Sequence, residues 1–529
     1  MPLVADKVDT PFIVVKYGGF VVKYIIAHDL GTTGNKSTLF AEDGRMLGSE
    51  VYSYDTHYFN ETWVEQNAED WWKAVCETSK NLIARTKINP SDVAVISFSG
   101  QMMGCLCVDK EGNPLRPSMI WADQRALKQA AEIDKKMPLR DYYQIAGHRN
   151  AASYGLQKLM WVRDNEPDIY KKTYKTLNAK DFVVFRLTGN FYTDYSDGNS
   201  NTCLDINKLE WSEEILKCAG IEKDKMPDVK PSIFVAGKVT EQAAKACGIV
   251  PGTPVVIGAG DGVTANVGAG SISPGKTFCC MGTSAWIATT AEKPVYDEQM
   301  RTVTWVHAVP GYYALNGTMQ YAGGSYNWLK NTICTDEIAK AEASGKSPYD
   351  FMNELIEKSP PGANGVIFLP YLLGERAPRW DPYAKGAFIG ITPETTRGDM
   401  IRSVLEGATM NLDIILKIMQ DKVSITEIMA LGGGAKGPIW RQIMADIYNT
   451  KITVPNLLEE AGSMGAAVIG GVGVGLFDDF TAIDRFIEVK SEHLPMENAE
   501  KVYEPIKKNF DVCYKALKET FADMSKKLN

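Results

Sequence analysis

The sequence predicts an α/β protein with two domains of similar design and a cleft between them. Strand-like apolar runs alternate with helical patterns along the chain, which is typical of α/β folds. The 529 residues exceed what one hydrophobic core usually supports, so two domains of roughly 250 residues each are expected. A strand interrupted by a Gly-Thr loop occurs near residue 31 and again near residue 282. Since only two copies occur, we predict a duplicated domain and not a solenoid.

The charge balance and the cysteines argue against several classes of protein. Lys and Arg total 57 against 65 Asp and Glu, for a net charge of -8, and no long basic run is present, so nucleic acid is not an expected partner. The ten cysteines lack the paired spacing of a structural zinc site, which favours free thiols and a cytoplasmic location. The small residues of 461–475 fit a tightly packed buried helix better than a membrane span, so no membrane partner is expected.

The chain divides into an extension and two domains. Residues 1–22 are expected to lie outside the fold, because their apolar run is interrupted by Lys16 and two glycines. The N-terminal domain is predicted to span 23–270 and the C-terminal domain 271–529. The boundary is placed near residue 270 because the Ser, Pro and Gly residues that follow it form the strongest linker signal between the halves.

An acidic residue ends the first strand-like run of the N-terminal domain. The run that starts at Tyr24 carries Asp29 into a loop of Gly31, Thr32 and Thr33. Glycines and hydroxyl groups in such a loop suit the wrapping of phosphate oxygens. The sequence therefore predicts a phosphate-binding loop directly after the first strand.

Regular elements follow this loop. Strands are expected at 36–40 and 46–54, with a tight turn between them. A helix through residue 84 is expected to begin at Asn67, an N-cap residue followed by a helical apolar pattern. A further strand at 93–98 leads into the run 99–104.

A second acidic residue stands at the end of a later strand-like run. The apolar run from Val255 ends among the glycines 258, 260 and 262, where Asp261 occurs. Glycines let the backbone approach a ligand closely, so this arrangement presents a base to a substrate, with a helix cap or structural carboxylate as the alternative. Together with the Asp29 loop, it indicates phosphoryl transfer.

The second half repeats the first and adds a glycine-rich turn. A strand from Lys276 runs into Gly282, Thr283 and Ser284 and then continues. Further on, a strand leads through the glycines 432–434 to a helix that begins near Pro438, where proline suits the first helical turn. A helix N-terminus after glycines favours an anionic or nucleotide ligand, although the turn is not a Walker A sequence.

These segments, taken together, resemble the FGGY family of carbohydrate kinases, within the larger actin-like, sugar kinase and heat-shock ATPase fold. The resemblance runs from about residue 23 to the region around residue 480. Its segments, in order, are 29–33, 99–104 with 121–125, 258–261, 282–284 and 431–436; residues 153–165 and 386–406 also resemble the two family signatures, although Gly155 departs from the first. The resemblance implies two actin-like (ribonuclease H-like) ATPase domains with an interdomain cleft.

The resemblance also implies roles for individual residues. Asp261 would accept the proton of the sugar hydroxyl that attacks the γ-phosphorus of ATP, and would lie near the metal. Asp29 would hold Mg²⁺, largely through water. The residues implied to bind ATP are Gly31, Thr32, Thr33, Lys36, Gly282, Thr283, Gly433, Gly434 and Ala435. The residues implied to bind the sugar are Gln101, Met102, Met103, Trp121, Asp123 and Asp261, with Trp121 as an apolar wall and Gln101 and Asp123 as hydrogen-bonding groups.

Within the family, the xylulokinases share the Ser-Gly-Gln-Met run and the Trp-x-Asp-x-Arg segment, which implies phosphorylation of D-xylulose to D-xylulose 5-phosphate. They typically carry His where this chain has Met103, which exchanges a hydrogen-bonding ring for an apolar thioether. Another ketose such as ribulose, a polyol, or a sugar acid such as gluconate therefore stays open. Glycerol is disfavoured because glycerol kinases carry Arg-Glu at 102–103.

Two other classes of protein stay open. A non-catalytic actin-like nucleotide-binding protein would show no sugar-stimulated turnover, and Asp261 counts against it. A sugar-responsive regulator is disfavoured because residues 1–22 contain no basic DNA-binding arm. The helix expected at about 498–527 either caps its domain or joins a partner, so a homodimer also stays open.

Overall fold

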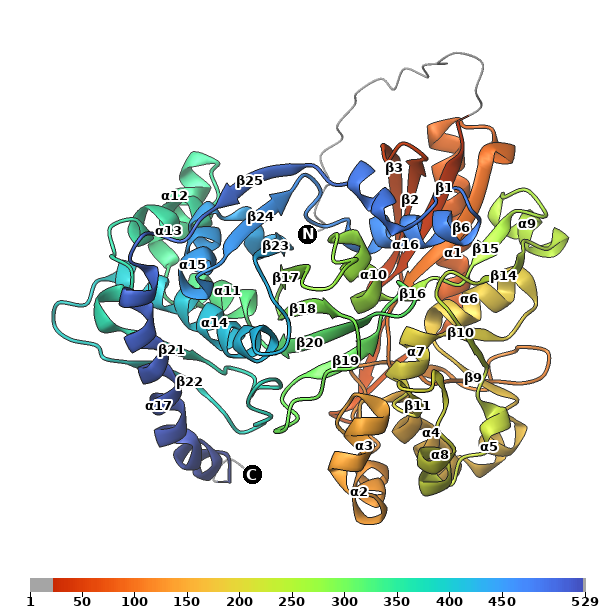
Figure 1. The fold of residues 1–529 in the computed structure, drawn as a ribbon, viewed down its shortest axis with the longest axis horizontal. Coiled ribbons are helices and arrows are strands. Elements are labelled where there is room, and N and C mark those ends of the chain that lie inside the picture. Colours follow the sequence, from red (N-terminus) through yellow and green to blue (C-terminus); the bar gives the residue numbers. More distant parts are fainter. Residues whose placement is uncertain (1–21, 527–529) are drawn as a thin grey trace.

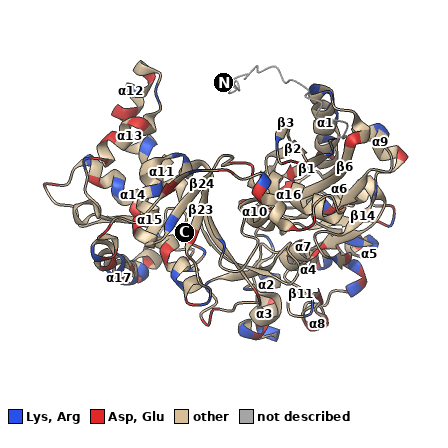
Figure 2. Cartoon of the chain, turned by 45° about the horizontal axis from the view of Figure 1, so that its top comes forward, with Lys and Arg blue, Asp and Glu red and all other residues tan. Residues whose placement is uncertain are grey.

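The computed structural model describes residues 22–526, so the extension predicted at 1–22 lies outside the described residues except for Val22. Two mixed sheets with helices around them form two domains, at the right and at the left of Figure 1. Acidic and basic residues are interspersed over both domains in Figure 2. Within the described range, none of the helices combines the length and the apolar character that a membrane span requires.

The first sheet confirms the predicted opening strands. Its order is β14-β15-β6-β1-β2-β3, with β16 also beside β6. β1 runs antiparallel to β2 and parallel to β6, and β15 and β16 are parallel to β6 as well. The strands are β1 (Tyr24–Leu30), β2 (Gly34–Ala41), β3 (Met46–Ser53), β6 (Val93–Gly100), β14 (Val235–Lys238), β15 (Pro254–Val256) and β16 (Ala259–Gly260).

The second sheet repeats the first. The order β3-β2-β1-β6-β15-β14 recurs as β20-β18-β17-β23-β24-β25, with the same sequence of parallel and antiparallel pairs, and β19 extends the edge. The predicted duplication is therefore confirmed by the topology. The strands are β17 (Thr277–Met281), β18 (Ala285–Ala291), β19 (Val303–Val306), β20 (Tyr313–Met319), β23 (Glu427–Leu431), β24 (Lys451–Pro455) and β25 (Val489–His493).

Three helices pack on one face of the first sheet. α1 (Ala68–Thr86) is capped by the Asn67 side chain as predicted, and ends two residues later than expected. Trp71 and Val75 of α1 join Phe182 of α6 (Ala179–Thr188) in a core that also includes α9 (Glu241–Cys247). The remaining helices of this half are α2 (Leu127–Lys136), α3 (Leu139–Ala146), α4 (Gly155–Asn165), α5 (Pro167–Lys172), α7 (Tyr195–Ser200), α8 (Glu213–Ala219) and α10 (Asp261–Gly268).

Short strand pairs complete this half and hold the loops near the sheet. They are β4 (His57–Phe59), β5 (Trp63–Gln66) and β8 (Ser118–Met119) in one group, β7 (Leu106–Val108) with β9 (Lys175–Leu177), β10 (Tyr192–Asp194) with β13 (Asp228–Lys230), and β11 (Leu204–Asp205) with β12 (Glu210–Trp211).

The core of the second domain includes the C-terminal helix. α17 (Ala499–Lys526) contributes Tyr503, Phe510 and Tyr514 to it, so this helix caps its own domain. α15 (Pro438–Tyr448) begins at the predicted proline. The other elements here are α11 (Gly323–Thr332), α12 (Thr335–Ser344), α13 (Pro348–Ile356), α14 (Arg397–Gln420), β21 (Ile367–Pro370) and β22 (Gly386–Ile389).

Two helices lie between the sheets and cross over between the halves (Figure 1). α16 (Ala461–Gly473) comes from the second half, yet Met464 and Val468 pack against β1 and β6 of the first sheet. α10 comes from the first half, yet Ala265 packs with Phe278 and Ala288 of the second sheet. The tightly packed buried helix predicted in 461–475 is therefore confirmed.

Glycines let α10 and α16 touch. A Cβ atom at Gly465 would lie 1.9 Å from the Thr264 carbonyl oxygen, and one at Gly268 would lie 1.8 Å from the Ala461 carbonyl oxygen. Both obstacles are backbone, so a side chain at either position would force the helices apart.

We predict that Gly465→Ala lowers the free energy of unfolding by about 1–3 kcal/mol, the usual cost of overpacking. The measurement is the urea midpoint of the nucleotide-free protein. Gly433→Ala is the control, since a Cβ there would meet no atom of the described chain within 4 Å. Equal midpoints for the two variants would contradict the close packing of α10 and α16.

Candidate active site

Three parallel strands end at one edge of the first sheet, and they bring two carboxylates together. Asp29 of β1 is paired in register with Ser99 of β6, and Gly260 of β16 is paired with Gly100. Asp261 follows Gly260 directly, as the first residue of α10. Since the carboxyl ends of parallel strands share an edge, Asp29 and Asp261 share it too, and ligands of α/β sheets bind at such edges.

The two carboxylates influence each other. Desolvation by the surrounding protein, together with the Asp29 charge, raises the pKa of Asp261 to about 7. Desolvation also raises the pKa of Asp29, while a hydrogen bond from Ser99 and the charge of Lys36 oppose that rise. The Asp261 side chain is open to solvent on one side, which limits its desolvation. A carboxylate with a pKa near neutrality is suited to accept a proton at physiological pH.

This pair of carboxylates fits a hydrated magnesium ion. Residues 22–526 contain no cluster of three His, Cys, Asp or Glu side chains of the kind that forms an all-protein metal cage. Mg²⁺ usually binds through one or two carboxylates and the phosphates of its substrate, and keeps several waters. Desolvation first, and the Asp29 charge second, raise the pKa of Asp261, and a cation beside both carboxylates would oppose this rise.

The first phosphate-type loop is held in place by side chains from three other segments. Gly31 N donates to Gly34 O at 3.0 Å, which closes the turn. The Tyr54 hydroxyl donates to Gly31 O at 2.5 Å, and Gln66 Nε2 donates to Thr32 O at 2.6 Å. Trp121 Nε1 donates to Thr32 Oγ1 at 2.9 Å. Hydrogen bonds from these three segments therefore hold the loop within the protein itself.

The second loop has a matching turn. Gly282 N donates to Ser284 O at 2.9 Å, and Gly323 N donates to Gly282 O at 3.0 Å. Thr283 is exposed at the tip of this loop, as Thr33 is at the tip of the first. Each domain thus presents one Gly-Thr turn at the end of its leading strand.

The triple-glycine turn packs beside the second loop. A Cβ atom at Gly434 would lie 2.7 Å from Met281 Cβ, and Met281 directly precedes that loop. Residues Gly433–Lys436 form a short 3-10 turn in which Gly433 is exposed. The Ala435 side chain is buried in the core of the second domain, so only the backbone at that position can face a nucleotide.

Lys36 has a different environment from the one that the resemblance implied. Its Nζ atom donates to Glu459 O at 2.9 Å and lies 3.0 Å from Glu460 Oε2, at the start of α16. Lys436 pairs with the same segment through Glu459 Oε1 at 2.6 Å. The ammonium of Lys36 therefore lies between the two halves of the chain and already contacts the start of α16.

Gln101 carries a buried acceptor close to the first loop. Its backbone N donates to Leu30 O at 2.8 Å, and its Nε2 donates to Gln66 Oε1 at 2.7 Å. Its Oε1 is buried and has no hydrogen-bond partner in the part of the chain that the structure describes. A buried acceptor of this kind is costly unless a ligand donates to it. Met102 packs beside it, with Cγ 2.5 Å from where a Cβ of Gly260 would be.

A buried lysine joins three loops around this region. Lys158 Nζ donates to the carbonyl oxygens of Met103 at 2.8 Å, Ile120 at 2.6 Å and Ser153 at 2.6 Å. Burial lowers the pKa of Lys158 to about 7. Met103 itself has a positive φ of 62°, a strained conformation for a methionine that these contacts hold.

Asp123 does not present a free carboxylate. It is fully buried, its Oδ2 accepts from Val64 N at 2.7 Å, and Arg125 donates to both of its oxygens at 2.6–3.0 Å. The expected hydrogen bond to a sugar hydroxyl is corrected to an internal ion pair. Trp121, two residues earlier, is 38% exposed, so this ion pair positions the loop that carries the indole.

Sequence reasoning missed several residues of this region. Gln66 links the first loop to Gln101, and Tyr54 holds Gly31. Neither stands in a recognisable motif. Arg376 faces Tyr154, and its buried Nε has no hydrogen-bond partner among residues 22–526. Its signal in the sequence is an Arg within a Gly-Glu-Arg-Ala-Pro turn, which alone does not predict burial.

Comparisons with known proteins agree over most of the chain. The N-terminal domain model of the FGGY family of carbohydrate kinases matches residues 24–268, and the C-terminal domain model matches 277–474. A gluconokinase of Bacillus subtilis is 31% identical, over 91% of this chain and 94% of its own. A xylulose kinase of Staphylococcus xylosus is 33% identical, over 91% and 98%. A gluconate kinase structure from Lactobacillus acidophilus superposes with a TM-score of 0.88 at 26% identity, over 95% of this chain and 100% of that one.

We predict that Asp261→Asn stabilises the protein more at pH 8 than at pH 5. The native carboxyl keeps its proton up to a pKa of about 7, whereas an unfolded Asp loses it near 3.8, so the contribution of Asp261 to stability falls as the pH rises through this window. Replacement by Asn removes that loss. The measurement is the denaturation midpoint of variant and wild type at both pH values.

Asp109→Asn is the control for this prediction. Burial raises the pKa of Asp109, but hydrogen bonds from Asn113 lower it by more, so the pKa lies below its ordinary value. This carboxyl is therefore ionised in both the folded and the unfolded state from pH 5 to 8. Its replacement should shift the midpoint equally at the two pH values. If Asp261→Asn also shifted the denaturation midpoint by the same amount at pH 5 and pH 8, the raised pKa of Asp261 would be contradicted.

Proposed function

Because the chain belongs to the FGGY family of carbohydrate kinases, we propose that it transfers the γ-phosphate of ATP to D-xylulose, giving D-xylulose 5-phosphate. The observation that carries this proposal is the pair of carboxylates, Asp29 and Asp261, at the strand edge that also bears the first Gly-Thr loop. The xylulose kinases among the relatives support the choice of acceptor.

Asp261 acts as the general base. Its carboxylate takes the proton from a terminal hydroxyl as that oxygen forms a bond to the γ-phosphorus, while the bond from the γ-phosphorus to the bridging oxygen breaks and ADP leaves. Asp29 and Asp261 would hold Mg²⁺, which supplies positive charge against the phosphate oxygens. Proton transfer to a base contributes about 100- to 10,000-fold, and positioning supplies much of the rest.

The two Gly-Thr loops hold the phosphates from opposite domains. Backbone N–H groups and hydroxyls of Thr33 and Thr283 are exposed at the loop tips and can donate to phosphate oxygens. The exposed backbone of Gly433 and Gly434 accommodates the adenosine. Closure of the domains excludes water, which protects ATP from hydrolysis.

The acceptor lies between Gln101, Met102, Met103 and Trp121. Gln101 Oε1 accepts a hydrogen bond from a sugar hydroxyl, which satisfies its buried lone pairs. The partly exposed Trp121 ring provides an apolar wall for the C–H face of the sugar, while its N–H stays on Thr32. Trp121 thereby couples the acceptor to the first phosphate loop.

A sugar acid such as gluconate is the second candidate acceptor, and Arg376 favours it. Burial lowers the pKa of the Arg376 guanidinium against the charge of Glu375, and its Nε has no partner in the described chain. Tyr154 follows Ser153, which Lys158 ties to Met103 at the acceptor pocket. A carboxylate on the acceptor would pair with this guanidinium. The gluconokinases among the relatives support the same alternative.

The domain limits and location are also part of the proposal. We assign 23–270 and 271–529 to the two domains, with α16 as a segment of the second half that packs on the first sheet. All ten cysteines are free, which together with ATP as phosphoryl donor supports a cytoplasmic location.

We predict that D-xylulose stimulates ADP release by the purified protein with MgATP. The panel includes D-xylulose, D-ribulose, D-gluconate, a polyol and glycerol. Asp261→Ala should reduce the stimulated rate by about 100- to 10,000-fold, because the base is lost, while ATP binding measured by calorimetry persists. A stimulated rate that survives in Asp261→Ala would contradict the role of the base.

Arg376→Met separates the two acceptors. If gluconate is the acceptor, this variant should lose kcat/KM for gluconate by about 10-fold or more, because a charge-assisted pair is removed. If D-xylulose is the acceptor, its kcat/KM should change little, since a neutral ketose has no carboxylate. Stimulation by glycerol alone would contradict both acceptors and leave the kinase class intact.

We also predict that the rate falls as the pH drops. The base must be ionised, so kcat/KM for the acceptor should fall about tenfold per pH unit below the pKa of Asp261. At low MgATP that pKa should lie near 7. Saturating MgATP should move the acid limb to lower pH, because a nearby cation favours the ionised carboxylate. A limb that does not respond to MgATP would contradict a shared metal and base site.

A further inference from the structure

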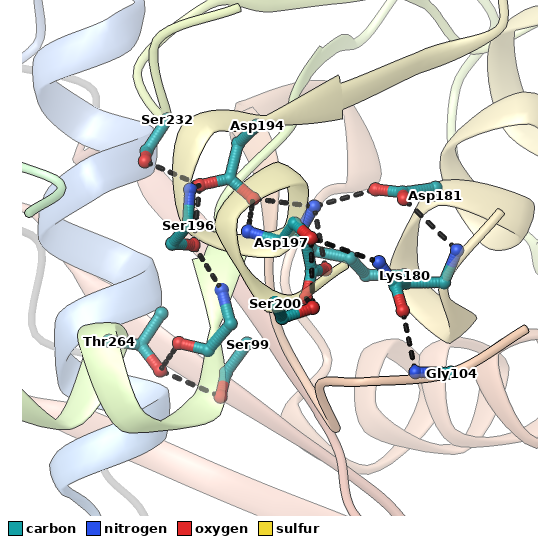
Figure 3. Close-up of polar contacts among 12 residues, drawn as sticks. Ser99, Gly104, Lys180, Asp181, Asp194, Ser196, Asp197, Ser200, Ser232 and Thr264 are labelled. Atoms are coloured by element: carbon teal, nitrogen blue, oxygen red, sulfur yellow. Dashed lines mark hydrogen bonds and ion pairs between the residues drawn. The ribbon is translucent and has the colours of Figure 1, made fainter. Parts of the chain in front are cut away.

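A buried ion cluster surrounds Lys180 (Figure 3). Lys180 Nζ, in α6, lies 2.6 Å from Asp181 Oδ1, 2.9 Å from Asp194 Oδ1 and 3.1 Å from Asp197 Oδ2. All four side chains are at most 1% exposed. No substrate can reach them, so the cluster has no direct part in binding or chemistry.

Stability alone does not account for this cluster. One buried ammonium faces three carboxyl groups, and burial raises the pKa of both Asp181 and Asp197, against the Lys180 charge. Buried ion pairs are often no more stabilising than apolar side chains of the same volume, because desolvation offsets the attraction. Their directional hydrogen bonds, however, fix geometry. The role of the cluster is therefore indicated by the backbone groups that it holds.

One arm of the cluster reaches the backbone beside Asp261. Asp194 Oδ2 accepts from Ser196 Oγ at 2.6 Å and from Ser232 Oγ at 2.8 Å. Ser196 Oγ in turn accepts from Gly260 N at 2.9 Å. Because the single hydroxyl proton of Ser196 is directed at the carboxylate, its lone pairs face the Gly260 N–H. The residue that precedes the base is thus held by a directed hydrogen bond.

A second arm reaches the acceptor pocket. Ser200 Oγ donates to Asp197 O at 2.8 Å and accepts from Met103 N at 3.0 Å. Asn178 Oδ1 accepts from Gly104 N at 2.8 Å, and its backbone N donates to Asp181 Oδ2 at 3.1 Å. The strained turn at Met103 is therefore fixed to the same cluster as the backbone of the base.

The opposite side of the same backbone is also fixed. Thr264 Oγ1, one turn into α10, donates to Ser99 Oγ at 2.8 Å, and Ser99 also hydrogen-bonds Asp29. Figure 3 shows Ser196 and the Ser99–Thr264 pair approaching this segment from two sides. The start of α10 is thereby held between the ion cluster and the strand edge.

We propose that the Lys180 cluster positions the base against the acceptor, with Ser196 as the positioning residue for Asp261 and Ser200 as that for the Met103 turn. This inference rests on the proposed function of Asp261 as the general base. A shift of about 1 Å in a reacting group can cost about 100-fold in rate, so a small movement of Gly260 reaches the chemistry.

Ser196→Ala and Ser232→Ala form a matched pair for the test. Both remove one hydroxyl donor from the same Asp194 oxygen, and both sites are buried, but only Ser196 accepts from Gly260 N. We expect Ser196→Ala to lower kcat of acceptor-stimulated ADP release by about 10- to 100-fold, with KM for MgATP unchanged. Ser232→Ala should keep the wild-type kcat. The melting temperatures of both variants are measured as well. If Ser196 had a purely structural role, the two variants would lose kcat and melting temperature in parallel.

Ser200→Ala tests the second arm, the hydrogen bond from Met103 N to Ser200 Oγ. It also provides an independent test if Ser196→Ala does not fold. It removes the acceptor of Met103 N, so KM for the acceptor should rise about 10-fold while KM for MgATP stays unchanged. Equal kcat for Ser196→Ala and Ser232→Ala, or an unchanged acceptor KM in Ser200→Ala, would overturn the inference. If the acceptor does not stimulate the wild type, or if Asp261→Ala keeps the stimulation, the proposed function fails. That result differs from failure of the positioning inference, in which the wild type is stimulated but the serine variants behave as the wild type does.

Discussion

The placement of Asp29 and Asp261 at one sheet edge is the constraint on which the rest of the structure depends. The parallel pairing of β1, β6 and β16 brings both carboxylates to one sheet edge, where the pKa of Asp261 is raised to about 7. A cation beside such a pair would lower the cost of ionising both carboxyl groups. The surrounding architecture, from the Gly-Thr loops to the Lys180 cluster, keeps the two groups in place despite that cost.

The exchange of α10 and α16 between the two halves connects this edge to the second domain. Asp261 begins α10, whose Ala265 packs with the second sheet, while α16 packs on the first. Glycines at 268 and 465 allow backbone contact between the helices. The helix that begins at Asp261 is therefore packed against the second sheet as well as the first.

Local patterns in the sequence were sufficient for the helix starts and for the strand ends that carry the two carboxylates. Asn67 and Pro438 mark helix starts, and Asp29 and Asp261 mark strand ends, because each signal lies within a few residues of the feature it predicts. The environment of the Lys36 ammonium could not be predicted in this way, since its partner Glu459 lies 423 positions away. The Asp123–Arg125 pair and the Lys180 cluster were missed for another reason: their charged side chains are buried, and burial is set by tertiary packing, which residue type alone does not reveal.

We propose above that Asp261 receives the proton of the acceptor between two phosphate loops. A crystal structure with D-xylulose, Mg²⁺ and a non-hydrolysable ATP analogue would show this geometry. We expect a terminal acceptor oxygen about 2.6–3.2 Å from an Asp261 oxygen, with the phosphates between the loops that carry Thr33 and Thr283. An acceptor whose hydroxyls all face away from Asp261, or phosphates bound outside these loops, would contradict it.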